Sequence, residues 1–589
     1  MIELDDSPPG GGRDAWEQAV AAVLTKMRRD DTRAAALDTR TLDGVEVPAL
    51  AAPRDDDGAA VGAFPYRRGV ATADEGWDAR ALVSATAPDP ARVALDELEN
   101  GSTSLWIRAQ DAASLAVVLD EVHLDLAPVV LDAVGCPAAD LAAALVERAP
   151  QSGRSLHPRT NLGADAFGAA LRSGAPADLD SLAQVARVAA QAGVRGVTVD
   201  ATAAYDAGSG DVTEIAFALA AGVESLRALD EAGIDVRDAL ALMEFRLSVS
   251  DDQFVSIAKL RAARQLWAAV ARECGVTDDA AVMHQHAVTA RPMLTRYDPW
   301  TNLLRTTIAA FAAGVGGAES VTVLPFDQAL GEPATLGRRM ARNISRLLVE
   351  ESHLGVVADP AGGSYAVEQL TDNLAEAAWS AFREVERAGG LRKALESGLI
   401  RDRIDRERDT RDEQVRTRRT PLTGVSEFPL ADESVLDRDP APLDPQVHSW
   451  AHEFEALRDD PAPVPVVLAA MGTVAEHTGR AGFATNALTA GGVPVRSTGA
   501  TAEPGDVVAA VHESRSPVAV LAASDQQYDE HGAAYVEALR AAGVRWVVLA
   551  GRPTDELGAL VDDHVAVGDD IVAKTRRIRA ELDRAGGES

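Results

Sequence analysis

Cysteine, aromatic residues and long apolar runs are all scarce in this sequence of 589 residues. It contains only two cysteines, Cys136 and Cys274, and its aromatic content is 4%. Two cysteines are too few for a disulfide framework or a cysteine-rich metal site, so a reducing cytoplasm is the expected location. No apolar run approaches the roughly 20 residues that a membrane span requires. The N-terminal residues form neither a basic segment nor an apolar core, so we expect no signal peptide.

Positive charge is scarce as well. The chain has 57 Lys and Arg residues against 91 Asp and Glu residues, which gives a formal net charge of −34. Nucleic acids and anionic membranes bind basic surfaces, so neither is an expected partner. With 47% hydrophobic and 25% charged residues, the composition is that of an ordinary soluble globular protein. At this length the chain exceeds a single hydrophobic core, and we expect several domains.

Residues 1–54 stand outside the repeating pattern of the rest of the chain. Residues 8–12, Pro-Pro-Gly-Gly-Gly, predict a flexible lead-in, and a helix is predicted from Ala15 to Met27. We expect this N-terminal arm to contribute to a subunit interface. The alternative, a helix that docks on its own domain, is left open by the sequence.

Residues 55–395 alternate short β-branched segments with longer helical segments. This pattern predicts a parallel α/β barrel or a doubly wound sheet. Helices are predicted over residues 214–229 and 253–272, the second from apolar residues at helical spacing. The predicted strands cover residues 103–107, 128–131, 194–199, 242–249, 284–289 and 320–324.

The remaining residues divide into a connector and a second α/β domain. Residues 396–460 are first dense in mixed charge and then rich in proline, which predicts a linker that wraps the surface or is partly ordered. Residues 461–589 repeat a βα unit about five times, with strands predicted over residues 464–470, 495–499, 518–522, 546–550 and 564–567. Such a domain is flavodoxin-like, and its ligands bind beyond the carboxyl ends of the strands.

The segment from residue 470 to residue 479 joins the first of these strands to a helix. It resembles the cobalamin-binding turn of the adenosylcobalamin-dependent acyl-CoA mutases, Lys-Met-Gly-x-Asp-x-His-x-x-Gly. In that turn the His coordinates cobalt, and the Asp and Lys hold the His. Of the motif, Met471, Gly472 and Gly479 remain.

The residues that would hold cobalt in that motif are replaced in this chain. Ala470 stands at the Lys, Val474 at the Asp and Glu476 at the His. An imidazole ligand needs a second partner to fix its tautomer, and the turn offers neither ligand nor partner. His477 is one residue out of register, so we expect it to point elsewhere. The resemblance implies a degenerate cobalamin-binding-type domain, from 461 to 589, that has lost its cofactor.

Further motifs of the same family occur between residues 195 and 395, in the family order. Residues 294–307, Leu-Thr-Arg-Tyr-Asp-Pro-Trp-Thr-Asn-Leu-Leu-Arg-Thr-Thr, resemble the T-x-x-D-P-x-N-N-x-x-R-T block of methylmalonyl-CoA mutases. A matching helix lies at 257–264, and residues 359–365 match a later block. The resemblance implies a (β/α)8 barrel, residues 55–395, linked to the flavodoxin-like domain. Each block alone indicates a turn, so we expect these residues to hold the ends of the barrel.

Two positions on the substrate side are also substituted relative to the family. The Ser-Gly-Tyr-His element, whose His hydrogen-bonds the substrate thioester carbonyl, becomes residues 200–203, with Ala203 at the His. Alanine has no donor with which to polarise a carbonyl. In the Arg-Pro-Trp-x-x-Arg-Gln-Tyr element, Trp77 and Arg80 remain and Leu82 replaces the Tyr that lies over the substrate. The resemblance therefore implies that no catalytic residue is intact.

Three other groups of residues are weaker candidates for a binding site. His284 and His286 would face one side of a strand, but no third ligand is evident nearby. His448 and His452 lie four residues apart on a possible helix with no acidic base between them, which favours a surface pair. We therefore predict no metal. Arg416, with two further arginines at 418 and 419, is a possible phosphate site, but the acids alongside favour solvated ion pairs.

Taken together, the resemblance implies a non-catalytic small subunit of a heterodimeric methylmalonyl-CoA mutase. Such an enzyme interconverts methylmalonyl-CoA and succinyl-CoA by the radical chemistry of adenosylcobalamin. The cofactor and the acyl-CoA substrate would then bind to the large subunit. Two alternatives remain: a stand-alone acyl-CoA mutase with atypical cobalamin binding, and a regulatory protein that interacts with a mutase.

Overall fold

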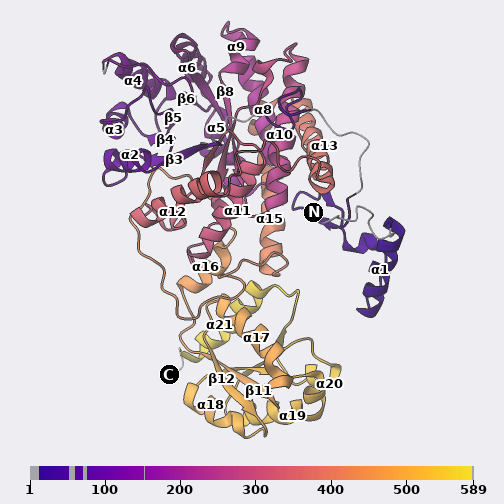
Figure 1. Cartoon of the computed structure of the whole chain (residues 1–589). Helices are drawn as coiled ribbons and strands as arrows, with labels where there is room; N and C mark the ends of the chain where they lie inside the picture. The colour runs from indigo at the N-terminus through magenta and orange to yellow at the C-terminus, as the bar shows by residue number, and fades with distance from the viewer. Residues whose placement is uncertain (1–11, 52–59, 71–75, 152, 587–589) are drawn as a thin grey trace, which may run out of the picture.

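The computed structural model describes residues 12–51, 60–70, 76–151 and 153–586 of the chain. Two α/β domains lie end to end, and a connector that begins with a long helix joins them (Figure 1). None of the helices in the described ranges combines the length and apolarity needed to cross a membrane.

The larger domain is a closed barrel of eight parallel strands. Around the barrel the order is β10-β3-β4-β5-β6-β7-β8-β9. The strands are β3 (Asp78–Ser84), β4 (Ser104–Ala109), β5 (Val129–Ala133), β6 (Asn161–Ala164), β7 (Arg195–Asp200), β8 (Met243–Val249), β9 (Gln285–Thr289) and β10 (Ser320–Thr322). The barrel confirms the predicted (β/α)8 architecture and excludes a doubly wound sheet for this domain.

The strand predictions found six of these eight strands and missed β3 and β6. In β6, Gly163 has a φ of +74°, and a side chain there would meet the backbone carbonyl of Leu131. The strand therefore has only four residues and an irregular register. In β3, Arg80 projects into the barrel and pairs with Glu244, and a buried arginine is not a residue that strand patterns predict.

Helices form the outer layer of the barrel. They are α2 (Pro90–Glu99), α3 (Ala112–Val118), α4 (Ala138–Gln151), α5 (Phe167–Ser173), α6 (Leu179–Ala192), α7 (Thr202–Asp206), α8 (Asp211–Glu231), α9 (Val236–Ala241), α10 (Gln253–Glu273), α11 (Thr301–Val315), α12 (Thr335–Arg346), α13 (Tyr365–Arg387) and α14 (Leu391–Glu396). Helices α8 and α10 confirm the two predicted helices. They are buried along most of their length because α13 packs outside them.

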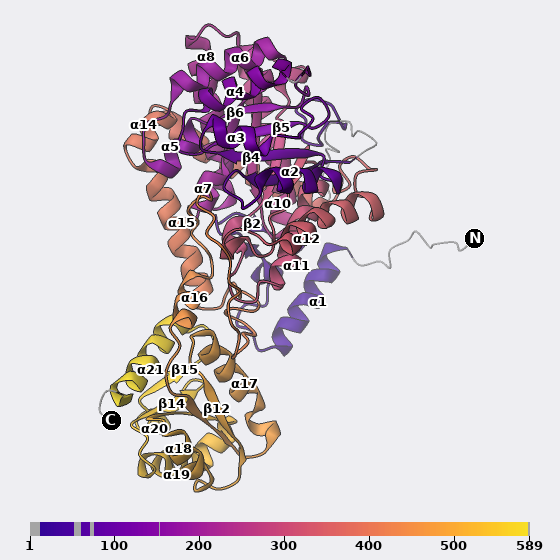
Figure 2. The same ribbon diagram turned by 90° about the vertical axis from the view of Figure 1, so that its left-hand side faces the viewer.

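The N-terminal segment has one part that stands apart and one part that is fixed to the barrel. Helix α1 (Arg13–Lys26) lies to one side of the molecule (Figures 1 and 2), and only its Leu24 is buried. A hairpin of β1 (Thr39–Arg40) and β2 (Glu46–Val47) follows. Asp43, which lies between these strands, accepts hydrogen bonds from the first two backbone N–H groups of α8, at 3.0 and 3.2 Å. The hairpin is thereby attached to the barrel, whereas α1 is not.

The connector runs from the barrel to the second domain across the carboxyl ends of the strands. Its charged first half forms helix α15 (Leu399–Arg416), and its end is helix α16 (His452–Asp459). Between them the chain is irregular and is held to the barrel by hydrogen bonds. The backbone N–H of Trp450, for example, donates to the carbonyl of Pro292 at 2.9 Å.

The second domain is a five-stranded parallel sheet in the order β12-β11-β13-β14-β15. This is the strand order of flavodoxin-like domains, so the predicted fold is confirmed. Its elements are β11 (Val466–Met471), α17 (Val474–Ala490), β12 (Val495–Thr501), α18 (Asp506–Ser514), β13 (Val518–Ala522), α19 (Asp525–Ala541), β14 (Trp546–Ala550), α20 (Asp555–Gly558), β15 (Asp563–Val565) and α21 (Ile571–Gly586).

The two faces of this sheet bury different helices. Helices α18 and α19 cover one face and form a core of their own with the sheet. Helices α17 and α21 cover the other face, where Phe454 and Leu457 of α16 join the apolar cluster that continues into the barrel. The second domain is thus attached to the barrel through α16.

Candidate functional site at the barrel mouth and the β11–α17 turn

The turn between β11 and α17 is closed by a helix-capping arrangement. Thr473 precedes the helix, and the Glu476 carboxylate accepts hydrogen bonds from the Thr473 backbone N–H and hydroxyl, both at 2.7 Å. Glu476 also accepts a hydrogen bond from Gln527 of α19 at 3.0 Å. These hydrogen bonds, above all that of the Thr473 hydroxyl, hold the pKa of Glu476 below its ordinary value. The residue aligned with the cobalt ligand therefore caps its own helix.

The glycines that remain from the motif differ in what the structure requires of them. Gly472 has a φ of +72°, and a Cβ there would lie 2.7 Å from the Glu476 carboxylate, so this position needs glycine. At Gly479, by contrast, a Cβ would meet nothing within 4 Å. The backbone of the family turn is kept at the first glycine, whereas nothing in the structure requires the second.

The residues that flank Glu476 do not supply a metal ligand to the turn. Val474 is 66% exposed and has no polar group. Ala470 is buried in β11, and His477 is buried beneath the surface, where its Nδ1 has no hydrogen-bond partner among the described residues. An exposed imidazole with a carboxylate behind it is what a cobalt ligand of the family type requires. The side chains at this turn do not fit that group.

On the barrel side, Ala203 lies on α7, directly after the carboxyl end of β7. This is the end of the barrel at which barrel enzymes carry their reacting groups. This residue is 2% exposed and lines a cavity of about 840 Å³ together with Asp132, Arg172 and His448. The cavity is roomy, but Ala203 offers it no hydrogen-bond donor.

Beneath this cavity the interior of the barrel is filled by an aromatic ring and ion pairs. The guanidinium of Arg246 lies 4.0 Å over the ring of Trp106 and donates to Asp200 at 2.9 Å. Arg172 donates to the same carboxylate at 3.0 Å. Burial opposes ionisation of Asp200, but the two arginines outweigh it, so the pKa of this carboxyl lies below its ordinary value. The barrel is therefore closed just below its mouth.

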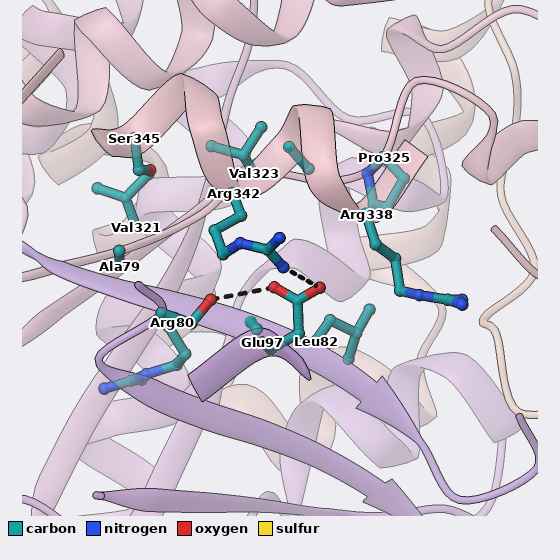
Figure 3. A pocket seen from close by; sticks show the side chains of 13 residues that line it. Ala79, Arg80, Leu82, Glu97, Val321, Val323, Pro325, Arg338, Arg342 and Ser345 are labelled. Carbon is teal, nitrogen blue, oxygen red and sulfur yellow. Dashed lines mark hydrogen bonds and ion pairs between the residues drawn. The ribbon is translucent and has the colours of Figure 1, made fainter. Parts of the chain in front are cut away.

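Leu82 lines a much smaller pocket, which lies between β3 and α12. The pocket has a volume of about 30 Å³, and Glu97 lies at its centre beside Leu82 (Figure 3). The Glu97 carboxylate accepts a hydrogen bond from Ser102 at 3.1 Å and pairs with Arg342 at 2.9 Å. Burial raises the pKa of Glu97, and Arg342 opposes this rise. Such a space holds one or two water molecules.

His284 and His286 make separate contacts within the barrel. His286 is buried in the barrel, and its Nε2 lies 2.8 Å from the Thr322 hydroxyl. Burial and neighbouring arginines keep its pKa well below the ordinary value, so it is neutral. His284 pairs with Glu319 at 2.9 Å. Within the described ranges neither belongs to a group of three metal-ligating side chains.

The family blocks and the arginine cluster hold the structure together. Asn302 donates to the carbonyls of Thr295 and Phe326, both at 2.8 Å. Arg305 donates to the carbonyl of Thr423 in the connector at 2.7 Å. Each of the three arginines at 416, 418 and 419 pairs with a glutamate. These side chains hold loops and helices in place.

Several charged residues of the mouth were not predicted from the sequence. Arg108 at the end of β4 donates to Asp132 of the next strand at 2.9 Å and to Asp444 of the connector at 3.0 Å. Asp165 lies 3.7 Å from Arg172. The only signal in the sequence is their position just at or after a strand end, which does not identify a partner.

Comparison with known proteins identifies the family of the chain. The family described as methylmalonyl-CoA mutase matches residues 109–513. The methylmalonyl-CoA mutase small subunit of Streptomyces virginiae is 42% identical, over 98% of this chain and 97% of the relative. That of Propionibacterium freudenreichii subsp. shermanii is 35% identical, over 97% and 95%. The methylmalonyl-CoA mutase of Escherichia coli (strain K12) is 34% identical, over 46% of this chain and 38% of the relative.

Fold and site together define an α/β protein in which a (β/α)8 barrel is followed by a flavodoxin-like domain with a capped first turn. The chain belongs to the methylmalonyl-CoA mutase family.

The capping role of Glu476 leads to a first prediction. Glu476→Ala removes the acceptor of both Thr473 hydrogen bonds and should lower the melting temperature of the chain. Glu476→Gln keeps an acceptor at the same place, as glutamine does in capping boxes, and should melt close to the wild type. Equal losses in the two variants, measured by circular dichroism, would mean that capping is not the role of this residue.

Asp165 gives a second prediction, on pH. Burial and the charge of Asp200 raise the pKa of Asp165 to about 7, although Gly168 donates to it at 2.9 Å. Because the folded-state pKa exceeds the unfolded value of about 3.9, the folded chain holds this proton more tightly. Stability associated with Asp165 is therefore lost as pH rises from about 4 to about 7.

The variant Asp165→Asn should thus be more stable than the wild type at pH 8, by roughly 1–3 kcal/mol, with a smaller difference at pH 5. Urea unfolding at both pH values measures this. Asp529→Asn on the exposed face of α19 is the control and should show no such change with pH. A gain for Asp165→Asn that is the same at pH 5 and pH 8 contradicts the assignment.

Proposed function

We propose that this chain is the non-catalytic small subunit of a heterodimeric methylmalonyl-CoA mutase. The observation that carries the proposal is the capping role of Glu476, because the residue at the cobalt-ligand position is committed to Thr473 and Gln527. Adenosylcobalamin and the acyl-CoA substrate would bind to the large subunit. There the cofactor would supply the radical chemistry that interconverts methylmalonyl-CoA and succinyl-CoA.

The barrel supports the proposal independently of the turn. Ala203 gives the cavity at the mouth no donor for a thioester carbonyl, and Leu82 lies beside a pocket of about 30 Å³. Two relatives that align over nearly the whole chain carry the name small subunit. Two free cysteines are compatible with a reducing cytoplasm as the location of the complex.

The N-terminal arm, residues 1–54, is the part we assign to the interface with the large subunit. Helix α1 has one covered face, with Leu24 buried, whereas its Val23 and the following residue, Met27, are 56% and 63% exposed. A permanent complex of two large chains buries about 2,000–5,000 Å². Because this chain is acidic, the contact has to rest on apolar surface and local pairing. Exposed apolar residues on an unpaired helix are of this kind.

Two other functions are compatible with membership of the family. A stand-alone acyl-CoA mutase would need an atypical mode of cobalamin binding as well as a replacement for the donor missing at Ala203. A regulatory protein of a mutase would bind its partner transiently. Purification of a stable one-to-one complex with the large subunit favours the subunit assignment over both.

A third prediction concerns the cofactor. The isolated chain, titrated with adenosylcobalamin and followed by its visible spectrum, should show no one-to-one binding in the micromolar range. The triple variant Ala470→Lys, Val474→Asp, Glu476→His restores the family motif and should gain some affinity. It should still show no turnover, because Ala203 is unchanged and catalytic groups act as a unit.

Tight binding by the wild type would remove the main support for the proposal. Turnover by the triple variant alone would mean that the substrate-side groups lie elsewhere. The large subunit, titrated in parallel, is the positive control for cofactor quality.

The fourth prediction concerns α1. Deleting residues 1–30 removes this helix and leaves Asp43 and the hairpin on the barrel. Affinity for the large subunit should fall at least about tenfold, or roughly 1.4 kcal/mol. The melting temperature of the isolated chain should stay unchanged, because α1 contributes only Leu24 to its core. Size-exclusion chromatography and calorimetry measure the two effects.

A point-variant pair removes the ambiguity of a deletion. Val23→Asp with Met27→Asp should weaken pairing in the full chain. Val117→Asp, at a valine of α3 that is 53% exposed, is the matched control and should pair normally. Full-affinity pairing of the deleted chain would exclude α1 from the interface.

A further inference from the structure

Three metal-ligating side chains meet where α15 and α16 approach each other beside the barrel mouth. Asp412 lies on α15, His452 begins α16, and His448 lies in the segment just before it. One ligand atom from each falls within 4.8 Å of the others. His448 Nε2 is 3.0 Å from Asp412 Oδ1, and the two imidazole rings are 4.4 Å apart.

We propose that Asp412, His448 and His452 form a binding site for a divalent transition metal ion, with Zn²⁺ as the ion that fits best. Two imidazoles and one carboxylate are a donor set typical of zinc with one position left open. Mg²⁺ and Ca²⁺ prefer oxygen ligands alone. The sequence showed the two histidines only, because Asp412 lies 36 residues before His448.

The hydrogen bonding of His452 leaves its Nε2 for an ion. Its Nδ1 lies 2.9 Å from the backbone carbonyl of Ser449. A carbonyl oxygen can only accept, so Nδ1 is the donor of this hydrogen bond and Nε2 is the nitrogen that can bind a metal. A backbone carbonyl on the second nitrogen is the usual support of a histidine that binds a metal through the first.

The spacing of the donors suits a tetrahedral ion after a small movement. Zinc bonds of about 2.0–2.1 Å place two ligand atoms of a tetrahedron roughly 3.3 Å apart. The pair formed by Asp412 and His448 is already at 3.0–3.2 Å. The ligand atom of His452 lies within 4.8 Å of the other two, and rotation of this half-buried side chain would close the remaining gap. Without metal, His448 and Asp412 share a hydrogen bond, which metal binding replaces.

The surroundings leave a path to the site and balance its charge. His448 and His452 line a cavity of about 560 Å³ that also borders Glu455 and Arg291. The cavity gives an ion or a water molecule access to the fourth position. On α15, Arg416 is paired with Glu453 at 3.3 Å, so it opposes metal binding less than a free guanidinium would.

The role we assign to the ion is to join the two ends of the connector. Helix α15 follows the barrel, whereas α16 packs on the second domain, where Arg579 donates to the carbonyl of Leu457 at 2.6 Å. A metal bound by both helices closes the irregular segment between residues 412 and 448. This would fix the second domain against the barrel and stabilise the chain.

The experiment uses the untagged full-length chain, stripped with EDTA and dialysed against ZnCl₂ or CoCl₂. We expect one Zn²⁺ per chain by elemental analysis, affinity in the low micromolar range or tighter, visible d–d absorption with Co²⁺, and a higher melting temperature with metal. The variants Asp412→Asn, His448→Ala and His452→Gln should each bind at least about tenfold more weakly and lose the thermal shift.

His531→Ala, at an exposed histidine of α19, is the control and should bind like the wild type. Circular dichroism without metal tests whether each variant is folded. A variant that does not fold is replaced by a conservative substitution at another of the three ligands. Two results overturn the proposal. One is a wild-type chain that retains no zinc and gives no Co²⁺ spectrum. The other is equal binding by the wild type and the folded ligand variants, which would show adventitious surface binding.

Discussion

A carboxylate buried inside a barrel needs cationic partners, because leaving such a charge unpaired costs about 3–5 kcal/mol. Asp200 at the end of β7 obtains them from Arg172 on α5 and Arg246 on β8. Arg172 also lies 3.8 Å from Asp206 on α7, so the same cation positions that helix. The carbonyl of Asp206 in turn accepts a hydrogen bond from the backbone N–H of His448 at 2.7 Å. The placement of the connector over the mouth thus depends on ion pairs that begin in the sheet.

The same positions that a catalytic relative is expected to use for chemistry contribute to folding in this chain. Glu476 caps α17 and reaches α19, and Ala203 is 2% exposed on α7 at the barrel end. Under the proposed function no selection for chemistry acts at these sites, and substitutions that favour stability can accumulate there. A histidine at 476 would have to give up the cap before it could bind a metal.

The sequence predicted the elements of the fold better than it predicted the interactions at the mouth. Buried parallel strands are short β-branched runs, which is why most barrel strands and all five strands of the second domain could be placed. The spacing Thr473-x-x-Glu476 is itself a capping-box signature, so the role of Glu476 was accessible from the sequence. The ion pairs were not, because their partners lie on different secondary-structure elements: Arg172 and Asp200 are 28 residues apart, and Asp200 and Arg246 are 46 apart. In the sequence, a charged residue that forms a buried ion pair looks the same as a charged residue that is exposed to solvent.

The connector shows why the charged region after the barrel could not be understood from composition. Helix α15 is densely charged, yet Arg411 is buried and its guanidinium lies 4.2 Å over the ring of Trp450. On the same helix, Asp412 faces His448, and Glu407 accepts a hydrogen bond from the backbone of Gly210 at 2.8 Å. From composition alone these charged residues would be assigned to the surface. In the fold they position one domain on the other. The second domain is thus attached to the barrel by contacts of the connector, through buried charges as well as apolar packing.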